Sequence, residues 1–95
     1  FTPKELNNMA IEYFQKNRLL PALDAIEKAL KLSPDSVKLM FSQLKILIKI
    51  KQEEQDIPDH IELANHMIVT LGKLNLEGKS LAAFAELALK WEQVN

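Results

Sequence analysis

The chain has 95 residues, of which 47% are hydrophobic and 26% charged, and its formal net charge is −1. This length allows one domain with a modest core, and the near-neutral charge with a single arginine, Arg18, argues against a nucleic-acid partner. The absence of cysteine excludes disulfides and thiol chemistry. It is compatible with the cytoplasmic location that we expect. No apolar run is long enough to predict a membrane span or a membrane partner.

Two short helices are expected in the first third of the chain. Residues 4–17 carry apolar side chains at helical spacing, and Thr2 and Glu5 are typical of a helix start. A second helix is expected over residues 21–32, after which Pro34 ends it. Its inward face is rich in small side chains, which predicts that another helix approaches closely: Ala22, Ala25 and Ala29.

A third, longer helix is expected over residues 35–52. Its polar side chains follow one another at intervals of four and three and so form one narrow stripe: Lys38, Ser42, Lys45, Lys49 and Gln52. Apolar side chains cover the rest of the circumference, which is typical of a helix in the middle of a bundle. A β-strand over residues 46–50 is the weaker alternative, because the stripe keeps its helical period for more than three turns.

Two further helices are expected in the last part of the chain. The first covers residues 58–71 and is expected to end at Gly72; its inward side chains are Ile61, Ala64, Ile68 and Leu71. The second covers residues 80–94 and is expected to begin with Ser80 as its cap. One face of it is predicted to join the core through Leu81, Phe84, Ala88 and Trp91. The fold class is therefore all-α, with about five helices.

Eight residues within the first 34 follow a pattern of large, small and apolar positions with a closing proline: Leu6, Met9, Ala10, Tyr13, Ala22, Ile26, Ala29 and Pro34. This pattern resembles the tetratricopeptide repeat (TPR), a helix pair of about 34 residues. Leu6 stands where the family has Trp, and Ala10 stands where it has Gly. A shift of 42 residues carries Ala22 and Ile26 onto Ala64 and Ile68, which indicates eight inserted residues in a second repeat.

The resemblance implies an all-α stack of antiparallel helix pairs, a TPR-like fragment of an α-solenoid. Residues 1–95 would then be a single domain, with a first repeat at 3–36, a degenerate second repeat at 37–76 and a capping helix at 80–94. The insertion would fall near residues 52–59. Because the chain begins with phenylalanine, we expect it to be a segment of a larger protein, for example a signalling protein of the response-regulator type.

TPR domains are interaction modules in which the first helix of each pair lines a groove for a partner peptide or helix. The groove positions that the resemblance implies are Lys4, Asn8, Ile11, Gln15, Lys38, Ser42, Lys45 and Lys49. We therefore expect a non-enzymatic module that binds a protein or peptide, with the lysines attracting an acidic segment. An ordinary solvated helix face is the alternative interpretation. A lysine–asparagine clamp for a terminal carboxylate, known in one TPR subgroup, is not expected, since its positions fall at Asn7 and Ile11.

The alternative function is structural, with apolar faces on the third to fifth helices pairing with a second copy of the chain to give a homodimer. No residue pattern typical of a catalytic, cofactor or metal site occurs in the sequence. His60 and His66 are separated by about 120° around one helix, which disfavours a shared metal ion. Four acidic residues are expected to form a solvated loop rather than a cation site: Glu53, Glu54, Asp56 and Asp59.

Overall fold

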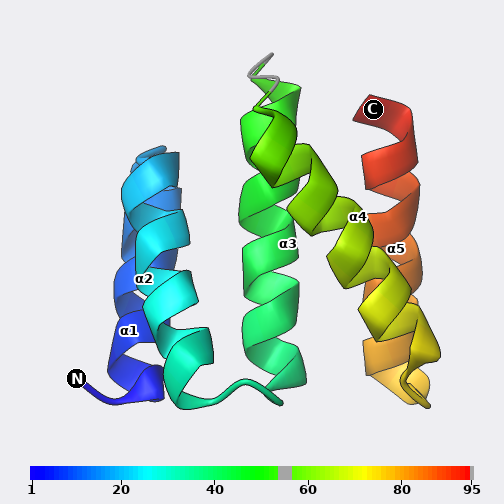
Figure 1. The fold of residues 1–95 in the computed structure, drawn as a ribbon, viewed down its shortest axis with the longest axis horizontal. Helices are drawn as coiled ribbons and strands as arrows, with labels where there is room; N and C mark the ends of the chain where they lie inside the picture. The colour runs from blue at the N-terminus through cyan, green and yellow to red at the C-terminus, as the bar shows by residue number, and fades with distance from the viewer. Residues whose placement is uncertain (54–56, 95) are drawn as a thin grey trace. The chain divides into compact units, whose positions relative to one another are not determined.

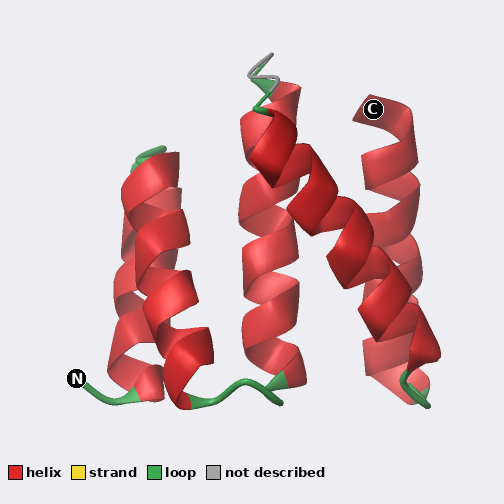
Figure 2. Ribbon diagram, viewed as in Figure 1, coloured by secondary structure: helices red, strands yellow, loops and turns green. Residues whose placement is uncertain are grey.

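The computed structural model describes residues 1–53 and 57–94, and within this part of the chain it contains five α-helices and no strand (Figures 1 and 2). The helices are α1 (Pro3–Gln15), α2 (Leu19–Leu32), α3 (Val37–Gln52), α4 (Pro58–Lys73) and α5 (Gly78–Val94). The predicted all-α class is confirmed. The chain forms two compact units, Phe1–Ile46 and Leu47–Asn95, and the division between them falls within α3.

Helix α1 has well-formed ends. At its start, the Thr2 hydroxyl accepts a hydrogen bond from the Glu5 backbone N–H at 3.2 Å, and the Glu5 carboxylate accepts one from the Thr2 N–H at 3.3 Å. This reciprocal pair is a capping box; the sequence predicted Thr2 as the cap but Glu5 only as an acid favoured near a helix start. At its end, Asn17 takes a positive φ of 60°, and the Arg18 N–H donates to the Tyr13 carbonyl at 2.8 Å. The chain therefore leaves α1 through a Schellman turn, in which asparagine occupies the left-handed position.

Helix α2 returns antiparallel to α1 and packs along it (Figure 1). It begins at Leu19, two residues before the predicted start. Pro21 then falls in the first turn, where proline is tolerated because the backbone N–H groups have no partner within the helix. The predicted inward face is buried almost completely: Ala22, Ala25, Ile26 and Ala29. Side chains that extend so little beyond the backbone allow the two helix axes to lie close together.

Helix α3 begins at Val37 rather than at residue 35. The Ser36 hydroxyl accepts a hydrogen bond from the Leu39 N–H at 3.3 Å, so that Ser36 supplies the cap. The helix extends to Gln52 without interruption, and the strand alternative for residues 46–50 is thereby excluded. Its apolar side chains are buried around most of the helix, as predicted: Leu39, Leu44, Ile46, Leu47, Ile48 and Ile50.

In the second unit, α4 and α5 run in opposite directions and contact each other (Figure 1). The prediction that Gly72 ends α4 is wrong. Gly72 lies within the helix, which ends at Lys73, and the chain departs through extended backbone at Leu74. The ring of Phe84 lies on Gly72, since a Cβ added there would be 3.6 Å from the ring atom Cζ. This is an ordinary van der Waals distance, so the contact with α5 would also accept alanine at this position.

Helix α5 begins at Gly78, so the prediction that Ser80 caps it is also wrong. Gly78 has a positive φ of 59°, a conformation that glycine adopts without strain. Trp91 is buried, and its indole N–H donates to the Asn65 side-chain oxygen of α4 at 2.8 Å. Phe84 is half-buried, whereas Leu81, which was predicted to join the same inward face, is exposed. None of the described helices combines the length and apolar character that crossing a membrane requires.

We predict that Ala22→Leu destabilises the first unit by about 1–3 kcal/mol, because three added carbon atoms must be accommodated between α1 and α2. Urea denaturation followed by circular dichroism measures the change. Ala82→Leu on the exposed side of α5 is the matched control and should have little effect. Equal stability of the two variants would show that α1 and α2 do not pack closely at Ala22.

Candidate functional site

A polar contact joins α1 to the first part of α3. The Ser42 hydroxyl lies 3.2 Å from the side-chain oxygen of Asn7 and 3.2 Å from the Lys38 carbonyl, and its single proton is donated toward these two acceptors. Asn7 exposes only 5% of its surface. The contact therefore identifies the side of α1 that faces α3 within the first unit.

The predicted groove positions of α1 lie beside this contact and away from α2. With about 100° of rotation per residue, Leu6 and Ala10 lie about 100° and 60° from Asn7 in one direction. Both are buried on the side of α1 against which α2 packs. In the other direction, about 40–100° from Asn7, lie Lys4, Asn8, Ile11 and Gln15. These four residues therefore share a face that α2 leaves uncovered.

The predicted positions of α3 lie on the same side of the contact. Helix α1 and the first part of α3 run in the same direction (Figure 1). Around the axis of α3, Lys38 and Lys45 lie about 40° and 60° from Ser42. This rotation has the opposite direction to the one that separates the four groove positions of α1 from Asn7. For two parallel helices that face each other, opposite rotations turn side chains toward the same side. We refer to this set as the α1–α3 surface: Lys4, Asn8, Ile11, Gln15, Lys38, Ser42 and Lys45.

Most residues of the α1–α3 surface are open to solvent. Five polar side chains are exposed, and Ile11 exposes 43% of its surface: Lys4, Asn8, Gln15, Lys38 and Lys45. Ser42 differs from the expectation, because it is half-buried and directed at Asn7 rather than outward. Lys49 is half-buried and belongs to the second unit, so that it is not part of the α1–α3 surface.

The lysines of this surface have no ion-pair partner on their own helix, a property that Lys31, Lys49, Lys73 and Lys79 share within the described residues. Lys16, Lys28 and Lys90 each lie within 3.5 Å of a carboxylate four residues earlier on the same helix. Across residues 1–53 and 57–94, neither Lys38 nor Lys45 has such a carboxylate partner, and the same holds for Lys4. The sequence already contains this difference, because the positions four residues before Lys38 and Lys45 are Pro34 and Phe41.

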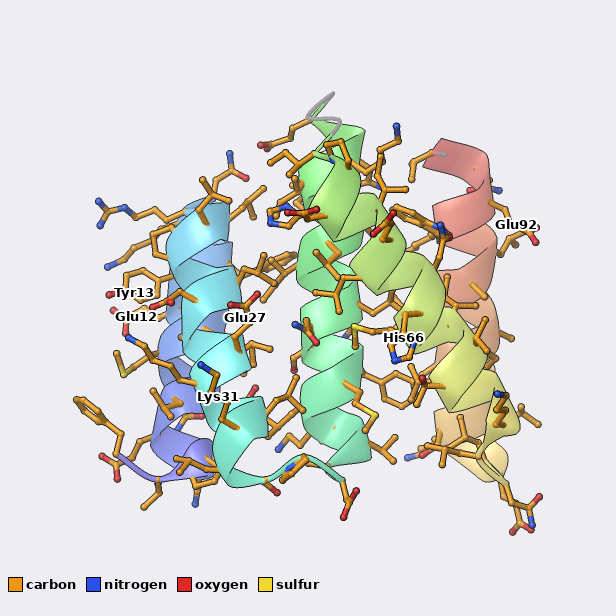
Figure 3. The ribbon with its side chains drawn as sticks, viewed as in Figure 1. Glu12, Tyr13, Glu27, Lys31, His66 and Glu92 are labelled. Atoms are coloured by element: carbon orange, nitrogen blue, oxygen red, sulfur yellow. The ribbon has the colours of Figure 1, made fainter. Side chains whose placement is uncertain are left out.

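Charges also occur on the outer face of α2, but they are mixed in sign. Glu27 and Lys31 lie one turn apart on exposed positions of α2 (Figure 3), and Asp24 pairs with Lys28 at 3.0 Å. Such alternation largely cancels the local potential at this face. The α1–α3 surface carries three positive charges and no negative one among its own members. It is therefore the face suited to an anionic partner.

Two buried polar residues were not anticipated from the sequence. Asn7 was considered only as an outward position, and Gln43 was not singled out, although both expose 5% of their surface. Asn7 is flanked in the sequence by Leu6 and, three residues later, by Ala10, which are both core positions. An asparagine placed among core positions is the signal that could have indicated an interhelical hydrogen bond.

The histidines and acidic residues do not assemble into a metal site. His66 is exposed, with its Nε2 atom 3.5 Å from the Thr70 hydroxyl (Figure 3). His60 is half-buried, and its Nδ1 atom has no hydrogen-bond partner among the residues that the structure describes. Within the described residues, no three side chains of His, Cys, Asp or Glu come together in a metal-binding group. Of the predicted acidic loop, Glu53 and Asp59 are exposed, and Glu54 and Asp56 lie outside the described residues.

Comparison of the chain with family models, with curated proteins and with solved structures finds no match. The candidate site is therefore defined by its geometry alone.

We predict that Ser42→Ala destabilises the first unit by about 1–2 kcal/mol, because it leaves the buried Asn7 oxygen without its donor. The double variant Asn7→Leu with Ser42→Ala should recover most of this loss, since leucine has the branching of asparagine and no polar atoms. Thermal denaturation of the single and double variants measures the coupling between the two positions. Losses that simply add would contradict the Asn7–Ser42 contact.

Proposed function

We propose that the chain is a TPR-like interaction module whose α1–α3 surface binds an acidic segment of a partner protein. The observation that carries the proposal is the set of three exposed lysines on one side of the Asn7–Ser42 contact. Lys4, Lys38 and Lys45 have no carboxylate partner within the described residues. A partner's carboxylates would supply the counter-charges that α1 and α3 do not provide.

The other members of the surface fit an extended peptide. Asn8 and Gln15 lie seven residues apart on α1, which is about 10.5 Å at 1.5 Å per residue. In an extended peptide, the backbone N–H and C=O groups of every second residue point to the same edge, and residues four apart are separated by about 13 Å. The two amide side chains, which extend beyond the helix, can therefore hydrogen-bond the partner backbone at positions four residues apart, and Ile11 between them offers an apolar contact. The residues suit a short acidic segment with an apolar side chain near its middle.

The TPR resemblance agrees with the burial of the residues that carry it. Five of them are almost completely buried: Leu6, Ala10, Ala22, Ile26 and Ala29. Small residues at the crossing of α1 and α2 leave the opposite side of α1 free, which is the side that the resemblance assigns to the partner. This agreement supports a TPR-like first repeat and hence a binding role for the face.

We predict that Lys38→Glu with Lys45→Glu weakens binding of a fluorescein-labelled decaglutamate peptide by about 5- to 30-fold at low ionic strength, measured by fluorescence anisotropy. Each of the two charge pairs is worth up to about 1 kcal/mol, and reversal adds repulsion. Salt should weaken the wild-type complex, because these charges are solvent-exposed.

The matched control is Lys28→Glu with Lys31→Glu, which changes the net charge by the same amount at exposed positions on the outer face of α2. This variant should bind the peptide within about twofold of the wild type, since the altered charges lie on a face of the first unit other than the α1–α3 surface. Equal weakening by both variants would attribute binding to overall charge and would refute the proposed site.

A further inference from the structure

An apolar stripe on α5 is left uncovered within the second unit. Leu81 and Leu89 expose 51% and 56% of their surface, and the exposed Ala85 lies midway between them. The spacing of four residues places the three side chains within about 80° of one another around the helix. The face of α5 that packs inward carries Leu87 and Trp91 and lies on the other side of the helix. We refer to Leu81, Ala85 and Leu89 as the α5 stripe.

We propose that the α5 stripe binds the α5 stripe of a second copy of this chain, with the two helices antiparallel and related by a twofold axis at Ala85. The stripe is symmetric about this residue, because Leu81 precedes it by four positions and Leu89 follows it by four. Each Leu81 then meets Leu89 of the second copy, and the two alanines allow the helices to approach closely.

Charge selects the antiparallel orientation. Glu92 continues the line of the α5 stripe, seven residues after Ala85, and projects outward from α5 (Figure 3). In the antiparallel pair it lies opposite position 78 of the second copy, where α5 begins. The free backbone N–H groups of a helix start and the neighbouring Lys79 favour a carboxylate there. Parallel helices would instead place the two Glu92 carboxylates side by side.

The expected dimer is weak. Helix α5 has 17 residues and is about 25 Å long. A single helix–helix contact of this length falls at the low end of interface sizes. We therefore expect a dissociation constant on the order of 10–100 µM, well above that of an obligate dimer.

Sedimentation equilibrium of the 95-residue chain between about 5 and 500 µM tests the proposal. The wild type should shift from monomer to dimer over this range. Leu89→Glu should raise the dissociation constant at least tenfold, because it places a carboxylate opposite Leu81 of the second copy. Leu20→Glu is the matched control, since Leu20 on α2 exposes 55% of its surface, and it should dimerise like the wild type.

Leu81→Lys combined with Leu89→Glu tests the orientation. In the antiparallel pair, the introduced lysine of one copy faces the introduced glutamate of the other, so that the double variant should dimerise more tightly than Leu89→Glu, although more weakly than the wild type because the apolar contacts are lost. A wild type that stays monomeric up to about 500 µM would overturn the proposal and leave the α5 stripe to another partner. Undiminished dimerisation of Leu89→Glu, or a double variant no better than Leu89→Glu, would also overturn it.

Discussion

The close approach of α1 and α2 depends on side chains that hardly extend beyond the backbone. Ala22 and Ala29 are completely buried on the face of α2 that packs against α1. Once α2 occupies this side of α1, the position of every other side chain around α1 follows from the helical repeat. Asn7 is turned toward α3, where it accepts from Ser42, and the face with Asn8 remains open. The proposed binding surface is thus a consequence of how the first helix pair packs.

Periodicity and local chemistry predicted the helices well, because these are properties of neighbouring residues. The Thr2 cap at the start of α1 and the buried alanines of α2 are examples. The prediction was wrong at two helix ends, because glycine and serine occur inside helices as well as at their ends, so that a single residue does not fix the boundary. Gly72 was expected to end α4, yet the helix continues past it under the ring of Phe84, a residue of the next helix. Ser80 was expected to cap α5, but Gly78, with its positive φ, begins the helix two residues earlier.

The candidate site was predictable only in part, because it depends on contacts between distant parts of the chain. The intervals of four and three between Lys38, Ser42 and Lys45 place them on one strip of α3, and the structure leaves both lysines exposed. The sequence did not indicate that Ser42 turns toward Asn7, because a hydrogen bond between positions 35 residues apart depends on how α1 and α3 pack. The absence of acidic partners four residues away could have distinguished the site lysines from Lys16 and Lys28, whose partners are visible in the sequence.

The α1–α3 surface and the α5 stripe suit different partners, since the first is cationic and hydrogen-bonding and the second is apolar and self-complementary. They lie in different units, so that each can be altered without changing the other. The proposal that α1 and the start of α3 present one binding face is best tested by amide chemical-shift mapping with an unlabelled decaglutamate peptide. We expect the largest changes at Lys4, Asn8, Ile11, Gln15, Lys38 and Lys45, and no change at Glu27 and Lys31 on α2. Changes centred on α2, or spread evenly over all helices, would contradict it.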